Sequence, residues 1–396
     1  MATCLATAGW AQEAAVDGGV AVSETPPPPS AEMIKASEAK PQQPPPPAFV
    51  WHAGLDDGLR VDTTDGNYGV QIGILVWTRF DTTFNDKSIK DQFTVPLVRP
   101  RLQAHFFRPW LTLFVQPEFA ISPRLLDLEF DIHPIDEIGI KLGQFMVPFS
   151  HSFLAPVPKL QFQGFTAANE TFRANRDTGV MLFGTFFDAR LEYFAGVFNG
   201  NTIDLLTNDN PQLLYAGRLA GTVFGKPPPS RSFAKYDETL HLPGTHPATL
   251  MLGIDGYINQ ASTSGQPDQL RKTGSVDVTF IWQRLYVAAE GYLQGLDTLI
   301  PGMMPTTQTR WGADVQVGYM IVPERFELAA RYCYTRFDAA KADSWFSQVD
   351  GQLNGYVFGN HLKAGLRYTL TDTGAAQRGF DPGISHSVFL QVQSWI

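Results

Sequence analysis

Residues 139–150 read G-I-K-L-G-Q-F-M-V-P-F-S, and residues 175–178 close the following long segment with N-R-D-T. Apolar side chains alternate with others over Ile138 to Met146, which predicts a β-strand. Pro148 ends that strand because it has no backbone N–H to donate. The segment 149–176 is too long and too rich in Phe and Leu for an ordinary connection. We therefore expect it to fold back into the mouth of a large barrel and narrow it.

The same two-residue alternation recurs from Tyr68 to the C-terminus. One face of each segment is apolar and the other carries polar or charged side chains, as where Val70 and Ile72 flank Gln71. About sixteen such segments of about ten residues follow one another. They predict an all-β fold, a transmembrane antiparallel β-barrel whose third outer loop is the long segment. A soluble β-sandwich would show a similar alternation and is the competing fold.

Three features favour the barrel over the sandwich. So many strands would overfill one sandwich. Short connections alternate with long ones, although 226–248 is long where a short turn is expected. Trp and Tyr also lie near strand ends, as the aromatic girdle of a membrane barrel requires. These girdle candidates are Trp77, Trp110, Tyr193, Trp282, Tyr334 and Trp395. The expected location is the bacterial outer membrane, with its lipid around the barrel.

The composition limits the classes of function. A net charge of -9 argues against a nucleic-acid partner. Cys333 would be alone in the mature chain, so neither a disulfide nor a cysteine-based zinc site is expected. His241 and His246 lack a third ligand nearby, so no metal site is predicted there. The sequence contains no G-x-S-x-G, P-loop or dinucleotide fingerprint. We therefore predict neither an enzyme nor a cofactor.

The chain divides into three parts. Residues 1–11 end in small residues typical of a signal-peptidase site but lack a basic n-region and an apolar core, which favours a truncated export-signal remnant. Residues 12–66 contain two runs of four prolines, at 26–29 and 44–47. We expect a largely disordered periplasmic linker there, with a PxxP ligand as the alternative. Residues 67–396 are expected to form the barrel.

Three motifs resemble the phosphate-selective porin O and P family. They are K-L-G-Q-F-M-V-P-F-S at 141–150, R-D-T-G-V at 176–180 and Y-F-A-G-V-F-N-G at 193–200. The resemblance implies a sixteen-stranded outer-membrane barrel, usually a homotrimer, with the third outer loop folded inside. It also implies passage of small anions such as phosphate.

A pore requires a wet constriction whose charges favour one sign of ion. The candidate constriction and anion-binding residues are Arg99, Arg101, Lys159, Arg173 and Arg176. Arg99 and Arg101 are two positions apart and so lie on one face of a strand, where guanidinium groups can bind phosphate oxygens. The alternative is that these cations pair with neighbouring carboxylates and hold the loop against the wall.

We therefore predict a porin for passive diffusion of small polar solutes, with a preference for anions. Two alternatives remain. The first is a non-conducting structural or adhesive outer-membrane barrel. The second is an outer-membrane hydrolase with a Ser-His pair that sequence spacing does not reveal.

Overall fold

The computed structural model describes residues 48–55, 58–85, 88–203, 208, 210–227, 246–262, 267–374 and 382–396. The predicted signal remnant (1–11) and the Pro-rich part of the linker lie outside the described residues. Residues from Pro47 onward form one compact unit.

Strands make up most of the described chain. In chain order the first strands are β1 (Phe49–Gly54), β2 (Gly58–Thr63), β3 (Gly69–Phe84), β4 (Ile89–Phe106), β5 (Arg108–Glu118), β6 (Arg124–Ile135) and β7 (Ile138–Met146). After a long connection come β8 (Arg176–Phe186), β9 (Leu191–Phe198), β10 (Leu214–Phe224), β11 (His246–Ala261), β12 (Asp268–Gln283) and β13 (Leu285–Leu299). The last are β14 (Thr306–Val322), β15 (Phe326–Arg336), β16 (Trp345–Phe358), β17 (Leu362–Thr373) and β18 (Gly383–Trp395).

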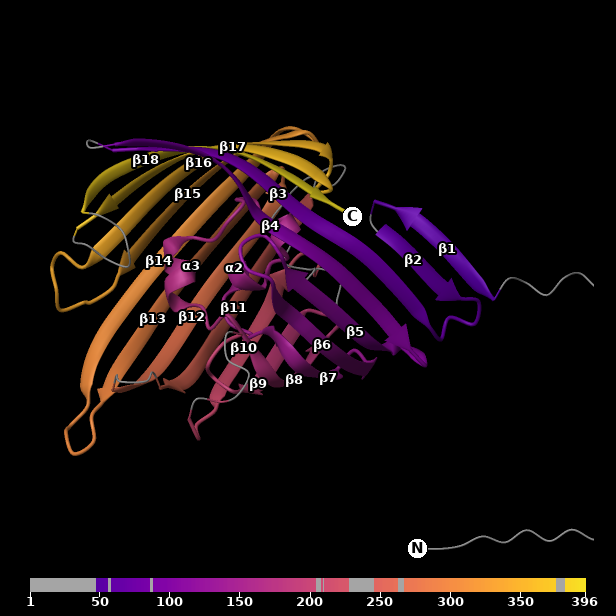
Figure 1. Cartoon of the computed structure of the whole chain (residues 1–396), viewed down its shortest axis with the longest axis horizontal. Helices are drawn as coiled ribbons and strands as arrows, with labels where there is room; N and C mark the ends of the chain where they lie inside the picture. The colour runs from indigo at the N-terminus through magenta and orange to yellow at the C-terminus, as the bar shows by residue number, and fades with distance from the viewer. Residues whose placement is uncertain are drawn as a thin grey trace, which may run out of the picture. The chain divides into compact units, whose positions relative to one another are not determined.

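The strands from β3 to β18 close into a barrel (Figure 1). Each pairs antiparallel with the next, and β18 returns to pair with β3 from Trp395↔Leu75 to His386↔Phe84. Counted over the described residues, the barrel has sixteen strands. Closure leaves no long open edge, which is why a sheet of this size can cross a bilayer. The predicted all-β antiparallel barrel is confirmed.

The two faces of the barrel wall differ as the alternation predicted. In β14, Val315, Val317 and Tyr319 are exposed, whereas Asp314 and Gln316 are buried. Apolar side chains are thus exposed on the outer face, as lipid requires, and polar ones face inward. The prediction of the aromatic girdle is wrong for two residues, because their side chains face inward and not toward lipid. Trp77 lies on the inner face, where it packs with Leu75 and Leu97, and Trp395 lines an internal cavity.

The connections at the two ends of the barrel differ in length. One end has the short turns at Phe107, 136–137, 187–190, Arg284, 323–325 and 359–361. The other end has the longer connections, including 147–175, 199–213 and 337–344. The long connection predicted on the short-turn side falls largely outside the described residues. We refer to the two ends as the short-turn end and the loop end.

A hairpin of β1 and β2 precedes the barrel. These strands pair from Phe49↔Thr63 to Gly54↔Gly58, and β2 pairs with the start of β3 from Leu59↔Ile72 to Asp62↔Gly69. The prediction that 12–66 is a linker is therefore wrong for 49–63. Each of these strands has only 6 residues, which is too short a stretch for the alternation to be recognised in the sequence, and β2 is held by its pairing with β3.

Three short helical segments lie in the connection 147–175. They are α2 (His151–Leu154), the single 3₁₀ turn η1 (Val157–Lys159) and α3 (Ala167–Phe172). Within the described residues no helix has the length and apolar character needed to cross a membrane.

Candidate functional site

The connection 147–175 packs against the polar inner face of β13 to β18. Its first contact is at the start of α2, where the carboxylate of Glu290 on β13 accepts three hydrogen bonds. The donors are the Ser150 hydroxyl (3.0 Å), the His151 amide (3.0 Å) and the Ser152 amide (3.4 Å). A buried carboxylate thus satisfies amides that the first turn of a helix leaves without partners.

The middle of the connection is bound through Gln161. Its side-chain nitrogen donates to Glu327 of β15 at 2.7 Å, and its backbone carbonyl accepts from Gln352 (2.9 Å) and Asn354 (3.0 Å) of β16. The ammonium of Lys363 on β17 donates to the Leu160 carbonyl at 2.7 Å. Polar side chains of the wall therefore supply the partners that irregular backbone needs when it is buried.

The α3 segment packs on β13 to β15. The Thr166 hydroxyl donates to Asp314 of β14 at 3.0 Å, and the ring of Phe172 stacks on Tyr292 with centroids 5.3 Å apart. Figure 1 shows α3 in front of β13 and β14. Two inward positions of β14 are glycines where the connection approaches the wall, so the backbones can come close together. A Cβ at Gly312 would lie 2.7 Å from the Phe172 ring, and one at Gly318 would lie 1.7 Å from the Gln161 side-chain nitrogen.

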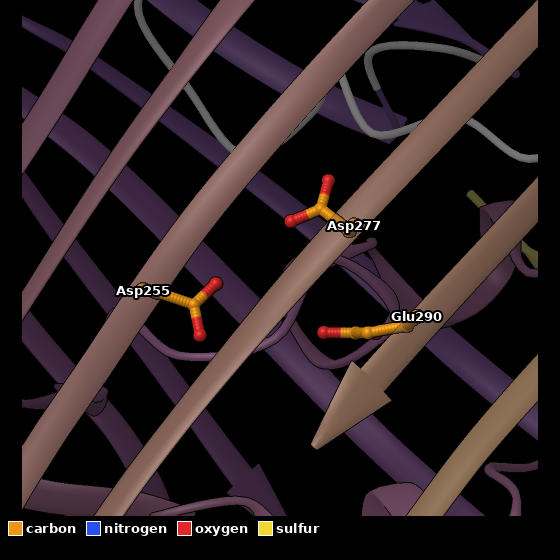
Figure 2. A group of neighbouring side chains, drawn as sticks. All are labelled: Asp255, Asp277 and Glu290. Atoms are coloured by element: carbon orange, nitrogen blue, oxygen red, sulfur yellow. The ribbon is translucent and has the colours of Figure 1, made fainter. Parts of the chain in front are cut away.

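Three carboxylates converge beside α2. Asp255, Asp277 and Glu290 come from β11, β12 and β13, and their side chains point toward one another (Figure 2). One oxygen of each lies within 4.8 Å of the others, a spacing that could hold a metal ion. However, the guanidinium of Arg218 bridges Asp277 (2.6 Å) and Asp255. Since Glu290 is already bonded to the connection, the group acts as an anchor for α2.

On the other side of the connection lies a cavity of about 460 Å³. It runs between residues 155–159 of the connection and the inner face of β3 to β9, with Trp395 of β18 at its margin. Four of the five predicted residues line it, namely Arg99, Arg101, Lys159 and Arg176. The sequence therefore identified most of the cationic lining of this cavity, which contains carboxylates as well.

The arginines that line the cavity differ in their partners. Arg99 donates to Glu118 at 2.7 Å, and Arg176 donates to Asp127 at 2.7 Å. In the part of the chain that the structure describes, Arg101 has no ion-pair partner. Its guanidinium lies over the Trp395 ring, 4.6 Å from the centroid. The alternative role of ion pairing thus describes Arg99 and Arg176, whereas no ion pair of Arg101 with an aspartate or glutamate is found among the described residues.

The fifth predicted residue, Arg173, lies away from this cavity. It pairs with Glu170 at 2.6 Å and is 4.9 Å from the rings of both Phe153 and Phe165. Burial raises the pKa of Glu170, and the Arg173 charge opposes that rise. Arg173 lines a second, polar cavity near the loop end. Its contacts are those of a residue that holds the connection together.

The residues that sequence reasoning missed are the anchors. The alternation places Glu290, Glu327 and Lys363 on the inner face of their strands, but it does not indicate which inward side chains contact the connection.

Asp177, in the N-R-D-T motif, is not the partner of its neighbour Arg176. Its carboxylate accepts from the amides of Gly200 (2.8 Å) and Thr202 (3.2 Å) and so holds the next connection.

Solved outer-membrane proteins share this architecture. The anion-selective porin from Comamonas acidovorans has a TM-score of 0.61 at 11% identity, covering 83% of this chain and 100% of that chain. OmpF from Salmonella typhi gives 0.59 at 10% identity, with 83% and 98% covered. The outer membrane channel DcaP of Acinetobacter baumannii gives 0.55 at 13% identity, with 85% and 99% covered.

No protein-family model and no curated protein matches the sequence. At the identities of the solved structures, the likeness establishes the fold alone. The chain therefore has the fold of outer-membrane porins, and its resemblance to the phosphate-selective family remains a prediction.

Proposed function

We propose that this chain is an outer-membrane porin through which small polar solutes diffuse passively, with a modest preference for anions such as phosphate. The observation that carries the proposal is the cavity between residues 155–159 and β3 to β9, which Arg101 and Lys159 line. In such a confined space fixed charges act on a solute more strongly than in bulk water.

The preference is expected to be modest because the cavity is lined by both signs of charge. Arg99 and Arg176 are paired with carboxylates, and Lys141 bonds to Glu129. Among the described residues Arg101 has no ion pair with an aspartate or glutamate, so it contributes to the attraction for an anion, while the carboxylates of the same lining oppose it. Phosphate fits this proposal because a guanidinium can bind its oxygens bidentately.

The proposal extends to assembly and location. OmpT from Vibrio cholerae has been solved in a trimer form. Its fold is similar to that of this chain, with a TM-score of 0.55 at 12% identity, and the match covers 83% of this chain and 99% of that chain. We propose a homotrimer in the bacterial outer membrane, with short turns on the periplasmic side. The protein is not expected to be an enzyme, since a pore needs no catalytic group.

The test is the reversal potential of the purified protein in a planar bilayer under a potassium chloride gradient at low salt, where screening is weak. We expect a chloride-side potential that moves toward the potassium side in Arg101→Gln and Lys159→Gln. Lys272→Gln is the matched control, because it removes one positive charge from an exposed position. A potassium-side potential in the wild type would reject the anion preference but keep the porin. Absence of conductance in folded protein would instead favour the non-conducting structural barrel.

A further inference from the structure

The β1–β2 hairpin has the same two-faced pattern as the barrel wall. Residues that pair directly across antiparallel strands place their side chains on one face of the sheet. Trp51 pairs with Val61, and Val61 pairs with Val70 on β3. Leu59 pairs in the same way with Ile72. The outer, apolar face of β3 therefore continues without interruption across the hairpin.

The opposite face of the hairpin is polar. His52 pairs with Arg60, and Arg60 pairs with Gln71, which lines the cavity described above. Arg60 is bonded on this face to Asp62 at 2.6 Å. A strand pair with one apolar and one polar face is what a position between lipid and an aqueous mouth requires.

Exposed aromatic side chains surround the short-turn end of the barrel. They lie at the turns or at the adjoining strand ends, and they are Tyr68, Phe107, Phe187, Phe224, Trp282, Phe326 and Phe358. Such a belt is typical of the level where a membrane protein meets lipid headgroups. The belt is interrupted between β16 and β3. Within the described part of the chain, β17 and β18 place no exposed aromatic side chain at this end.

The hairpin lies in that interruption. β18 ends at Trp395, and the backbone of Ile396 bonds to Ile74. The part of β3 before Ile74 pairs instead with β2. β1 lies beyond β2, and its outer face carries Trp51 and Phe49 with 67% and 55% of their surfaces exposed. These two rings supply the aromatic side chains that β17 and β18 lack.

We propose that the outer face of the β1–β2 hairpin is embedded in the lipid interface at the short-turn end, where Trp51 and Phe49 complete the aromatic belt. The occupant of this surface is phospholipid, because the surface is continuous with the lipid-facing wall of β3. The inference depends on the barrel and is independent of conduction.

Single-cysteine labelling tests this position. Trp51→Cys and His52→Cys, each in a background with Cys4→Ser and Cys333→Ala, are labelled with an environment-sensitive dye. The full chain is then reconstituted into phosphatidylethanolamine–phosphatidylglycerol vesicles, with heat-modifiable migration on gels as the check on folding. The two positions are adjacent on one strand but lie on opposite faces, so each serves as the control for the other.

We expect doxyl-labelled lipid to quench the dye at position 51 several-fold more than at position 52, and aqueous iodide to show the reverse order. Equal iodide quenching at both positions would overturn the proposal, because the apolar face would then be in water. A dye at position 51 that is shielded from both quenchers would also overturn it, in favour of a second protein copy as the occupant.

Discussion

Gly318 on β14 offers a direct test of how the 147–175 connection is held. A Cβ at this position would lie 1.7 Å from the side-chain nitrogen of Gln161 and 2.7 Å from an oxygen of Glu327. Both distances are below any real contact of a Cβ with a heavy atom. Gly318→Ala must therefore displace the Gln161 amide from its hydrogen bond with Glu327, while the strand itself accepts alanine readily.

The size of the effect follows from the bonds that change. The bond from Gln161 to Glu327 is 2.7 Å long, fully buried and made to a carboxylate. Such a bond contributes roughly 1.5–3 kcal/mol. Glu327 keeps its bonds from Asn354 (3.0 Å) and Tyr356 (2.6 Å), so it is not left as an isolated buried charge. We take the loss of this hydrogen bond to destabilise the bound connection by about 2 kcal/mol. This free energy corresponds to about a thirtyfold rise in the population of molecules whose connection is detached from the wall.

The assay is hydrogen exchange of peptides from 157–165, measured by mass spectrometry on the folded barrel in detergent. Gly351→Ala on β16 is the matched control, because a Cβ there would have no heavy atom within 4 Å. We expect exchange in 157–165 to accelerate about thirtyfold in Gly318→Ala, while peptides of β3 and β4 stay unchanged. If the two variants exchange alike in 157–165, Gln161 does not hold the connection and the anchoring argument fails.

Three further variants probe other contacts. Lys363→Met removes the donor to the Leu160 carbonyl (2.7 Å) and should accelerate exchange in 157–165 by at least tenfold, with the exposed Lys272→Met as control. Asp177→Ala leaves the amides of 200 and 202 without their acceptor, so exchange should rise in 199–203 and not in 157–165. Burial lowers the pKa of His151 to about 4, whereas its pKa in the unfolded chain is near 6.5. As the pH falls, the unfolded chain therefore binds a proton at this residue before the folded chain does. The free energy of unfolding should therefore fall by on the order of 3 kcal/mol as the pH drops from 6.5 toward 4, and thermal unfolding of His151→Gln should lack this loss.

The barrel could be predicted because membrane strands follow one simple rule. Each residue faces either lipid or the interior, so alternation in β7 or β14 carries both the secondary structure and the direction of the side chain. The girdle expectation, and not the alternation, failed at Trp77 and Trp395. Both residues have the inward phase of their strands, with Leu75 and Gln393 respectively, but their aromatic character assigned them to lipid. The alternation missed β1 and β2, whose short stretches become strands through pairing with β3.

The site was predictable only where a residue's position in sequence settles its position in space. Arg99 and Arg101 share a strand face, so their common direction was certain and both line the cavity. Arg173 lies in the irregular connection, and Arg176 follows directly after it as the first residue of β8. The path of the connection depends on contacts with strands more than a hundred residues away. One of the two arginines lines the cavity and the other lies between Phe153 and Phe165.

The path of the connection decides which interior charges can act on a solute. Glu290, Glu327 and Lys363 face inward, yet each is committed to backbone or side-chain groups of 150–161. The lining of the cavity between the connection and β3 to β9 remains, and there Arg101 has no ion pair with an aspartate or glutamate among the described residues. Selectivity should therefore respond to Arg101→Gln far more than to a change of equal charge at Lys363, and a larger shift from the latter would show that β17 also borders the path of the ions.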